Sequence, residues 1–197
     1  MKHITILIIA LFVGLTTFAQ NSPERSVSLR LGVPIGISYQ VYTGKKDHFE
    51  FILGSASPYW FNHYYINSFN NLSKYKDFKY LNHSVTSTIF LEGRYLKDFP
   101  IPTAGMEGQL NWYCGVGAVL KAARMSYTYT NITATPPTQR DERTDIDFGP
   151  EAIVGGEYWL EDTPFSFFGE TSVMLEVFDR ATGRLFGAVG VRYHFYH

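Results

Sequence analysis

Apolar and polar residues alternate with a period of two along most of this chain, and this pattern constrains the fold more than any other feature of the sequence. Between Val27 and Val41 every odd position is apolar, and the closing segment GRLFGAVGVRYHF places Leu185 and Phe195 on one face in the same way. Successive side chains point to opposite faces in a β-strand, so each such segment predicts a strand with one apolar face. The runs exceed the roughly 5–6 residues of a typical soluble strand and suit a tilted strand that crosses a membrane.

Pro34, which lies between Gly32 and Gly36, determines how many strands the first alternating stretch contains. Proline cannot donate a hydrogen bond to a β-ladder, so a tight turn here divides the stretch into strands at 26–32 and 36–43. A single strand through Pro34 would leave an odd total, whereas single-chain bacterial membrane barrels have an even number. We therefore predict an all-β fold, a closed antiparallel up-and-down transmembrane β-barrel of about eight strands.

The alternation alone does not say which face points outward. A soluble lipocalin-like barrel turns its apolar face inward around a ligand, and a membrane barrel turns that face outward to lipid. Aromatic residues of the apolar face gather beside one set of turns, as aromatic residues do at a membrane interface, which favours the membrane barrel. These aromatic residues are Tyr39, Phe49, Tyr95, Trp112, Tyr158, Phe165, Tyr193 and Phe195.

The opposite face carries charges of both signs among small residues. An eight-stranded barrel has room inside only for side chains, so we expect a lumen filled by paired arginines and carboxylates. Glu170 and Glu176 are expected to pair with Arg192, Arg30 or Arg94. The residues assigned to this polar lumen are Arg30, Glu50, Glu92, Arg94, Lys121, Glu157, Glu170, Glu176 and Arg192.

The first 19 residues have the pattern of a cleaved secretory signal peptide. Lys2 precedes an apolar run, and Thr17 and Ala19 are small residues ahead of the expected cleavage site. We therefore expect residues 1–19 to be removed and residues 20–197 to form one exported barrel domain. The net charge of −1 gives no electrostatic case for nucleic-acid binding, and Cys114, the single cysteine, cannot form an intrachain disulfide.

Two long segments are expected as outer loops, at 57–82 and 131–144. The first is rich in aromatic residues and is a candidate for binding a glycan or a protein at the surface, because long loops often carry function. An equally weighted alternative is that this loop folds down and caps the barrel. The candidate contact residues are Tyr59, Trp60, Phe61, Tyr64 and Tyr65.

Catalytic and metal-binding patterns are weak. His83 and Ser84 lie at the outer end of a strand, but adjacent strand residues point to opposite faces and are poorly placed to work together. Asp145, Asp147 and Glu151 are expected near the outer rim, where carboxylates could bind a divalent cation, but they lack the spacing of a ligand loop. We expect no catalytic residue, no metal and no cofactor.

Several stretches resemble the small outer-membrane β-barrel proteins of Gram-negative bacteria, of the OmpA/OmpX type. They are LRLGVPIGISY, LNWYCGVGA, FGPEAIVGGEYWLEDTPFSFF and GAVGVRYHFYH. The last stretch resembles the C-terminal sorting signal of such barrels, although Tyr196 and His197 follow the Phe195 on which the usual signal would end. The resemblance implies an outer-membrane location, with outer-membrane lipid and the barrel assembly machinery as partners.

The sequence thus predicts a non-enzymatic outer-membrane barrel with a structural, adhesive or surface-binding role. Two alternatives stay open at this point. One is an outer-membrane hydrolase that modifies lipid A, and the other is a soluble periplasmic lipocalin-like binding protein.

Overall fold

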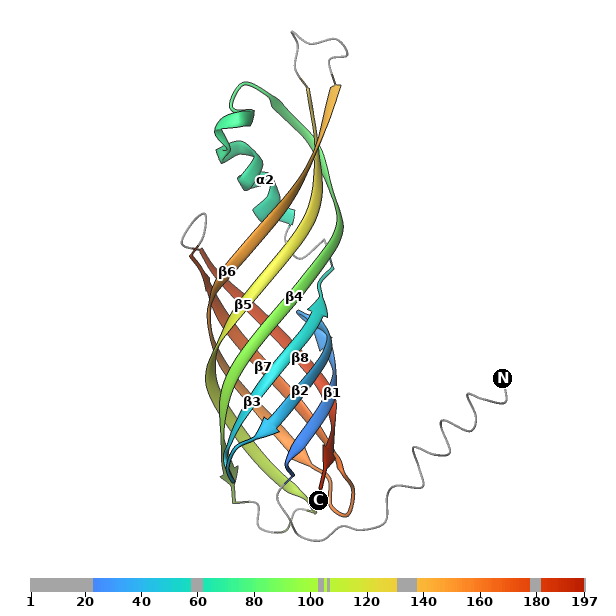
Figure 1. Cartoon of the computed structure of the whole chain (residues 1–197), viewed down its shortest axis with the longest axis vertical. Coiled ribbons are helices and arrows are strands. Elements are labelled where there is room, and N and C mark those ends of the chain that lie inside the picture. The colour runs from blue at the N-terminus through green and yellow to red at the C-terminus, as the bar shows by residue number, and fades with distance from the viewer. Residues whose placement is uncertain are drawn as a thin grey trace, which may run out of the picture.

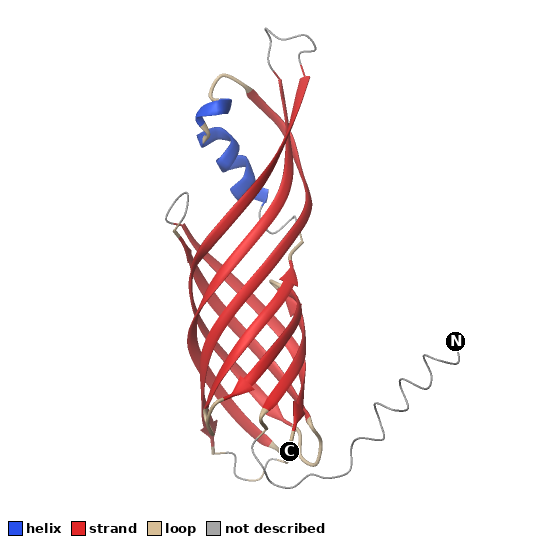
Figure 2. Cartoon of the chain, viewed as in Figure 1, coloured by secondary structure: helices blue, strands red, loops and turns tan. Residues whose placement is uncertain are grey.

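The computed structural model describes residues 23–57, 62–102, 105, 107–130, 138–177 and 182–196. In these residues eight antiparallel strands follow one another around a closed barrel, and the last strand pairs with the first (Figures 1 and 2). This confirms the all-β class and the strand number. The expected signal peptide at 1–19 lies outside the described residues.

The strands differ greatly in length, and a helical segment follows the third. The strands are β1 (Arg25–Gly32), β2 (Ile35–Tyr42), β3 (Asp47–Ser55), β4 (Lys79–Ile101), β5 (Gln109–Thr130), β6 (Thr138–Trp159), β7 (Phe165–Glu176) and β8 (Thr182–Phe195). The helices are α2 (Asn62–Asn71) and the short 3-10 helix η2 (Ser73–Tyr75). In the ranges given above, neither helix has the length and apolar character needed to span a membrane.

The expected turn at Pro34 is present between β1 and β2. The two strands pair with Leu29 opposite Ile37 and Val27 opposite Tyr39, so apolar residues at odd positions meet across the turn on one face. This register explains why one uninterrupted pattern runs through two strands.

The apolar face of the barrel points outward and the charged face points inward. Leu29 and Val116 are exposed over 67% and 62% of their surface, whereas Arg30 and Glu50 are exposed over 1% and 0%. Burying charges while exposing large apolar side chains costs free energy in water, so this arrangement suits an apolar surrounding medium. The faces are opposite to those of a soluble lipocalin-like barrel.

The outward apolar surface forms a belt with a sharp upper limit. On β4, β5 and β6 its last row consists of Ile89, Ala122 and Ile146. The next outward row is polar and consists of Ser87, Arg124 and Thr144. Along β5, the step from Trp112 to Ala122 covers about 25 Å of barrel height at about 3.3 Å per residue and a tilt of about 40°. This height matches the apolar band of a membrane barrel.

Beyond this limit, β4, β5 and β6 continue as a three-stranded sheet with α2 and η2 against it, and we call this part the head (Figure 1). The predicted loop ranges 57–82 and 131–144 are therefore too long. Residues 62–71 are helical, and 79–82 and 138–144 belong to strands. In 138–144 the outward side chains are polar, as at Glu142, so the alternation that identifies the other strands disappears there.

Candidate functional site

Arg94 lies at the centre of a buried ionic cluster in the lower part of the lumen. Its guanidinium donates a bidentate pair of hydrogen bonds to Glu151, with Nε–Oε2 and Nη2–Oε1 distances of 3.0 and 2.8 Å. It also lies 2.6 Å from Glu170, 2.7 Å from Glu92 and 3.6 Å from Glu50. Charge-assisted contacts of this kind are strong in a site that excludes water.

Two further arginines extend this cluster to the neighbouring strands. Arg30 donates to Glu170 at 2.5 Å, and Arg192 forms an ion pair with Glu157. Both guanidinium groups contact the ring of Phe168, whose centroid lies 5.4 Å from Cζ of Arg30 and 4.7 Å from Cζ of Arg192. The inner ionic cluster, as we call it, comprises Arg30, Arg94, Arg192, Glu50, Glu92, Glu151, Glu157 and Glu170.

Two glycines make room for the large side chains of this cluster. A Cβ atom at Gly155 would lie 2.4 Å from Cζ of Tyr113, and one at Gly190 would lie 2.5 Å from Cε1 of Phe168. Because Gly155 leaves this space, the Tyr113 hydroxyl reaches Glu170 and donates a hydrogen bond of 2.8 Å. The glycines therefore allow a crowded lumen to close.

An apolar layer covers the inner ionic cluster. Phe90, Val119, Met174 and Phe186 are each exposed over no more than 5% of their surface, and the two phenylalanine rings meet edge to face at 6.0 Å. Close-packed apolar side chains leave little space for water. This layer therefore opposes a continuous aqueous path through the barrel.

A second ionic group lies above the apolar layer. Arg184 contacts Glu176 at 2.5 Å and Asp147 at 3.1 Å, and Lys121 also pairs with Asp147. The expectation that Glu176 pairs with Arg30, Arg94 or Arg192 is therefore wrong. Arg184 is not among the residues predicted for the lumen, although its even position places it on the same inward face as Arg192.

The acidic residues expected at the outer rim lie inside the barrel instead. Asp145, Asp147 and Glu151 are exposed over 5%, 1% and 3% of their surface. Two arginines and a lysine form ion pairs with these carboxylates, so basic side chains of the same chain compensate their negative charges. Within the described part of the chain, no group of three or more His, Cys, Asp or Glu side chains is arranged to hold a metal ion.

A serine, a histidine and a glutamate meet near the inner end of the lumen, a grouping that strand alternation alone does not predict. Ser166 Oγ lies 2.8 Å from Nε2 of His194, and Glu157 Oε1 lies 3.4 Å from the same nitrogen. In a catalytic triad the serine and the acid bind different nitrogens of the histidine ring. All three side chains are also buried to at least 98%. The group has the contacts of a packed hydrogen-bond cluster rather than those of a nucleophile relay.

The histidine and serine singled out from the sequence have separate partners. His83 Nδ1 lies 2.6 Å from the hydroxyl of Tyr80, and Ser84 Oγ lies 2.9 Å from Ser126 Oγ. Neither contact joins the two residues to each other.

The head has an aromatic core. Phe69 of α2 stacks on Tyr75 with ring centroids 4.5 Å apart, and it lies 5.2 Å from Tyr127 and 5.8 Å from Tyr129 of β5. The hydroxyl of Tyr127 donates a hydrogen bond of 3.0 Å to the backbone carbonyl of Tyr65. The described part of the aromatic segment thus folds against the sheet.

Tyr65 is fully buried, so its expected role as an exposed surface contact is wrong. Tyr59, Trp60 and Phe61 lie outside the described residues, as does the side chain of Tyr64. The spacing of Tyr65, Phe69 and Leu72, at i, i+4 and i+7, is the sequence signal that would have identified α2 and its buried face.

An ion pair ties the helical segment of the head to β6. Asp141 Oδ2 accepts hydrogen bonds from Lys74 Nζ, at 2.5 Å, and from the hydroxyl of Tyr75. The hydrogen bond from Lys74 lowers the pKa of Asp141 below its usual value of 3.8. Because the folded-state pKa is lowered, this contribution to stability is present above the usual value and is lost as the pH falls through the lowered one.

Replacing Asp141 by asparagine should therefore loosen the helical segment at neutral pH. We expect several-fold faster amide hydrogen exchange in α2 and η2, with exchange in β7 and β8 unchanged, measured by mass spectrometry. Glu142→Gln is the matched control, because Glu142 contacts Arg124 at 3.6 Å and both side chains are about two-thirds exposed. Equal exchange in the two variants would show that the pair does not hold the head.

The aromatic residues expected at the inner interface lie on the outward face near the inner ends of their strands. Trp112 stacks on Phe99 with ring centroids 4.4 Å apart, and Phe165 meets Tyr193 edge to face at 5.2 Å. Tyr158 and Tyr193 are half-buried. The more exposed members are Tyr39, Phe49, Tyr95, Trp112, Phe165 and Phe195.

Comparison with solved structures finds similar chains, among them one bacterial β-barrel domain. The N-terminal β-barrel domain of Pseudomonas aeruginosa OprF aligns with a TM-score of 0.45 and 12% identity, over 89% of this chain and 98% of that one. No protein-family model and no curated protein sequence matches the chain.

Proposed function

We propose that the protein is an integral outer-membrane β-barrel with a structural or surface-binding role and no catalytic activity. The observation that carries this proposal is the orientation of the faces, with large apolar side chains outside and buried ion pairs inside. Only a closed barrel satisfies every backbone hydrogen bond of a membrane-crossing sheet, and this chain forms one.

The belt and the aromatic residues agree with this placement. The belt is about 25 Å high, as a membrane barrel requires, and Tyr95, Trp112 and Phe165 lie toward its inner limit. Outer-membrane lipid is therefore the proposed partner of the belt, and the barrel assembly machinery the proposed partner of the chain before it folds.

The head is the part of the protein that we expect to project from the outer surface of the membrane. It is a sheet and helix fixed by buried aromatic rings, and its outward face carries Arg124, Arg140 and Glu142. A rigid, charged surface that projects past the belt suits contact with a glycan or a protein. A lipid A-modifying hydrolase is less well supported, because Ser166 and its neighbours are buried and share one histidine nitrogen.

Single cysteines at the two ends of the barrel test this topology. In a Cys114→Ala background, we expect Lys76→Cys in the head to react with a membrane-impermeant maleimide on intact cells. Lys46→Cys, in the turn between β2 and β3, should react only after the outer membrane is permeabilised. Both lysines are exposed in the folded chain, so only the membrane should distinguish them.

Labelling of both positions on intact cells, or of neither, would contradict the proposed orientation. Migration on a gel that changes on heating would establish that each variant has folded into a barrel before it is scored.

A further inference from the structure

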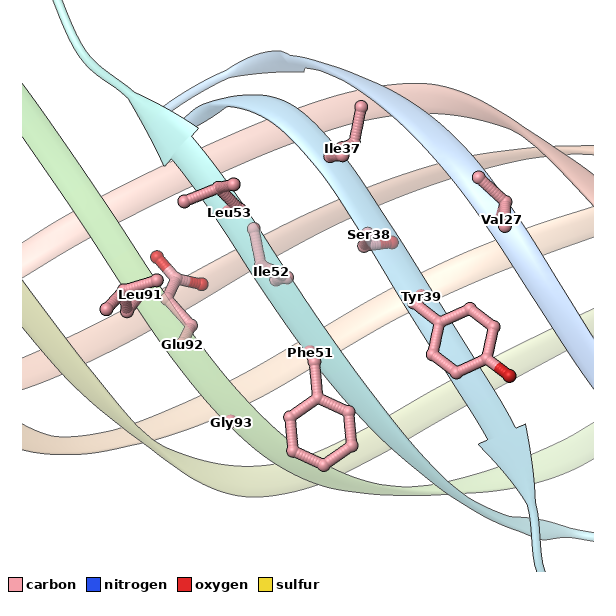
Figure 3. A pocket seen from close by; sticks show the side chains of 10 residues that line it. All are labelled: Val27, Ile37, Ser38, Tyr39, Phe51, Ile52, Leu53, Leu91, Glu92 and Gly93. Carbon is pink, nitrogen blue, oxygen red and sulfur yellow. The ribbon is translucent and has the colours of Figure 1, made fainter.

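The outward belt is interrupted by an apolar groove over β1 to β4. Its volume is about 490 Å³, and Phe51, Tyr39 and Leu91 border it on the outer surface (Figure 3). Gly93 forms its floor beside Phe51, and a Cβ atom at Gly93 would meet no atom within 4 Å. A missing side chain therefore leaves space among large apolar neighbours.

A second cavity continues this groove to the inner rim of the barrel. It has a volume of about 240 Å³ and shares Val27 and Tyr39 with the first. Glu24, Arg25 and Phe195 complete its lining. The space thus runs from the middle of the belt to a charged end at the level of the interface aromatic residues.

The charges at this end are free to bind a ligand. Arg25 and Glu24 are both exposed, and among the described residues neither side chain has an ion pair or a side-chain hydrogen bond. The Glu24 backbone is fixed by hydrogen bonds to Phe195 and Tyr42, so the charged end has a defined position. Arg25 and Glu24 thus both line the cavity where the apolar groove meets water.

We propose that this groove binds one phospholipid of the inner leaflet, with a phosphoethanolamine headgroup. One acyl chain lies over Phe51 and Gly93, the phosphate lies against Arg25, and the ammonium group lies against Glu24. Arginine binds phosphate through charge-assisted hydrogen bonds, and the carboxylate accepts hydrogen bonds from the ammonium group. The inference rests on the proposed membrane location of the belt.

The charge pattern favours this headgroup over an anionic one. A phosphatidylglycerol molecule also has a phosphate for Arg25, but it has no cation for Glu24, whose carboxylate would repel its negative charge. Selectivity for the zwitterionic lipid is therefore a consequence of the Glu24–Arg25 pair.

Native mass spectrometry of the delipidated, detergent-solubilised barrel tests the groove. Titration with phosphatidylethanolamine should give one bound lipid, and Gly93→Phe should weaken its binding about tenfold by filling the groove. Gly169→Phe is the matched control, because Gly169 lies on β7 away from the groove and a Cβ there has ordinary contact with Val189 at 3.8 Å. Equal lipid binding by the two variants would overturn the proposal.

The headgroup is tested separately, in case Gly93→Phe fails to fold. Arg25→Gln should weaken phosphatidylethanolamine binding about tenfold through loss of the charged hydrogen bond, while Lys45→Gln at the same rim should leave it unchanged. The parent should bind phosphatidylglycerol more weakly than phosphatidylethanolamine. Unchanged binding by Arg25→Gln, or equal binding of the two lipids, would overturn the proposal. These outcomes concern a purified barrel, so they are independent of the labelling that tests its membrane topology.

Discussion

Replacing Arg94 by methionine should destabilise the barrel by about 3–5 kcal/mol, because it leaves buried carboxylates without their shared cation. Arg94 lies within 2.8 Å of Glu92, Glu151 and Glu170, and its side chain is 1% exposed. Methionine has a similar length, so the lost interaction is that of the guanidinium rather than of the packed stem. Urea unfolding of the barrel in lipid vesicles, followed by heat-modifiable migration on gels, measures the change.

Two further variants separate the charge effect from general damage to the lumen. Glu92→Leu should have a much smaller effect, since Arg94 keeps its contacts with Glu151, Glu170 and Glu50. Glu92→Leu therefore leaves no arginine unpaired. Adding Glu151→Gln to Arg94→Met should restore part of the stability by removing one of the uncompensated charges. A loss of less than about 1 kcal/mol in Arg94→Met would contradict a structural role for the cluster.

The barrel could be predicted from the sequence because its two faces are in different surroundings. Where apolar, outward-facing side chains such as Leu29 alternate with buried charged side chains such as Arg30, a period of two is visible in the sequence itself. The turn at Pro34 followed from backbone chemistry, since proline has no hydrogen to donate to the ladder. The pairing register of the strands then brings together most of the charged side chains that alternation assigns to the lumen.

The head could not be predicted in the same way. The outward side chains of 138–144 are polar because this part lies above the belt, so no apolar period marks the strand. Asparagine is a weak helix former, and α2 contains several, so helix propensity pointed away from the observed structure. Its buried face is made by Tyr65 and Phe69, and their partners lie on β5, far away in the sequence.

Alternation also cannot predict which charged side chains pair inside the lumen. It places Glu176 and Arg192 on the same inward face, but it does not give the height of each residue along the barrel axis. This height decides which charges meet. Glu176 lies above the apolar layer and pairs with Arg184, whereas Arg192 lies below that layer and pairs with Glu157. Strand register, which the sequence does not display, is therefore what fixes the partners.

An arginine placed on the outward belt should destabilise the barrel according to its depth. Val116→Arg, in the middle of the belt, is expected to cost about 2–4 kcal/mol in a bilayer, because a charge there must leave water for hydrocarbon. Leu81→Arg is the matched control, since Leu81 is also a large exposed apolar residue but belongs to the head, above the belt. Because this side chain is exposed to water, Leu81→Arg should change the free energy of unfolding by no more than about 0.5 kcal/mol.

The unfolding free energies of these two variants in phosphatidylcholine vesicles test most directly whether the apolar face is a membrane-spanning surface. The predicted result is a large loss for Val116→Arg and almost none for Leu81→Arg. If both variants remained within about 0.5 kcal/mol of the parent, the outward face would be one that tolerates charge as a water-exposed surface does, and the membrane-barrel account would be contradicted.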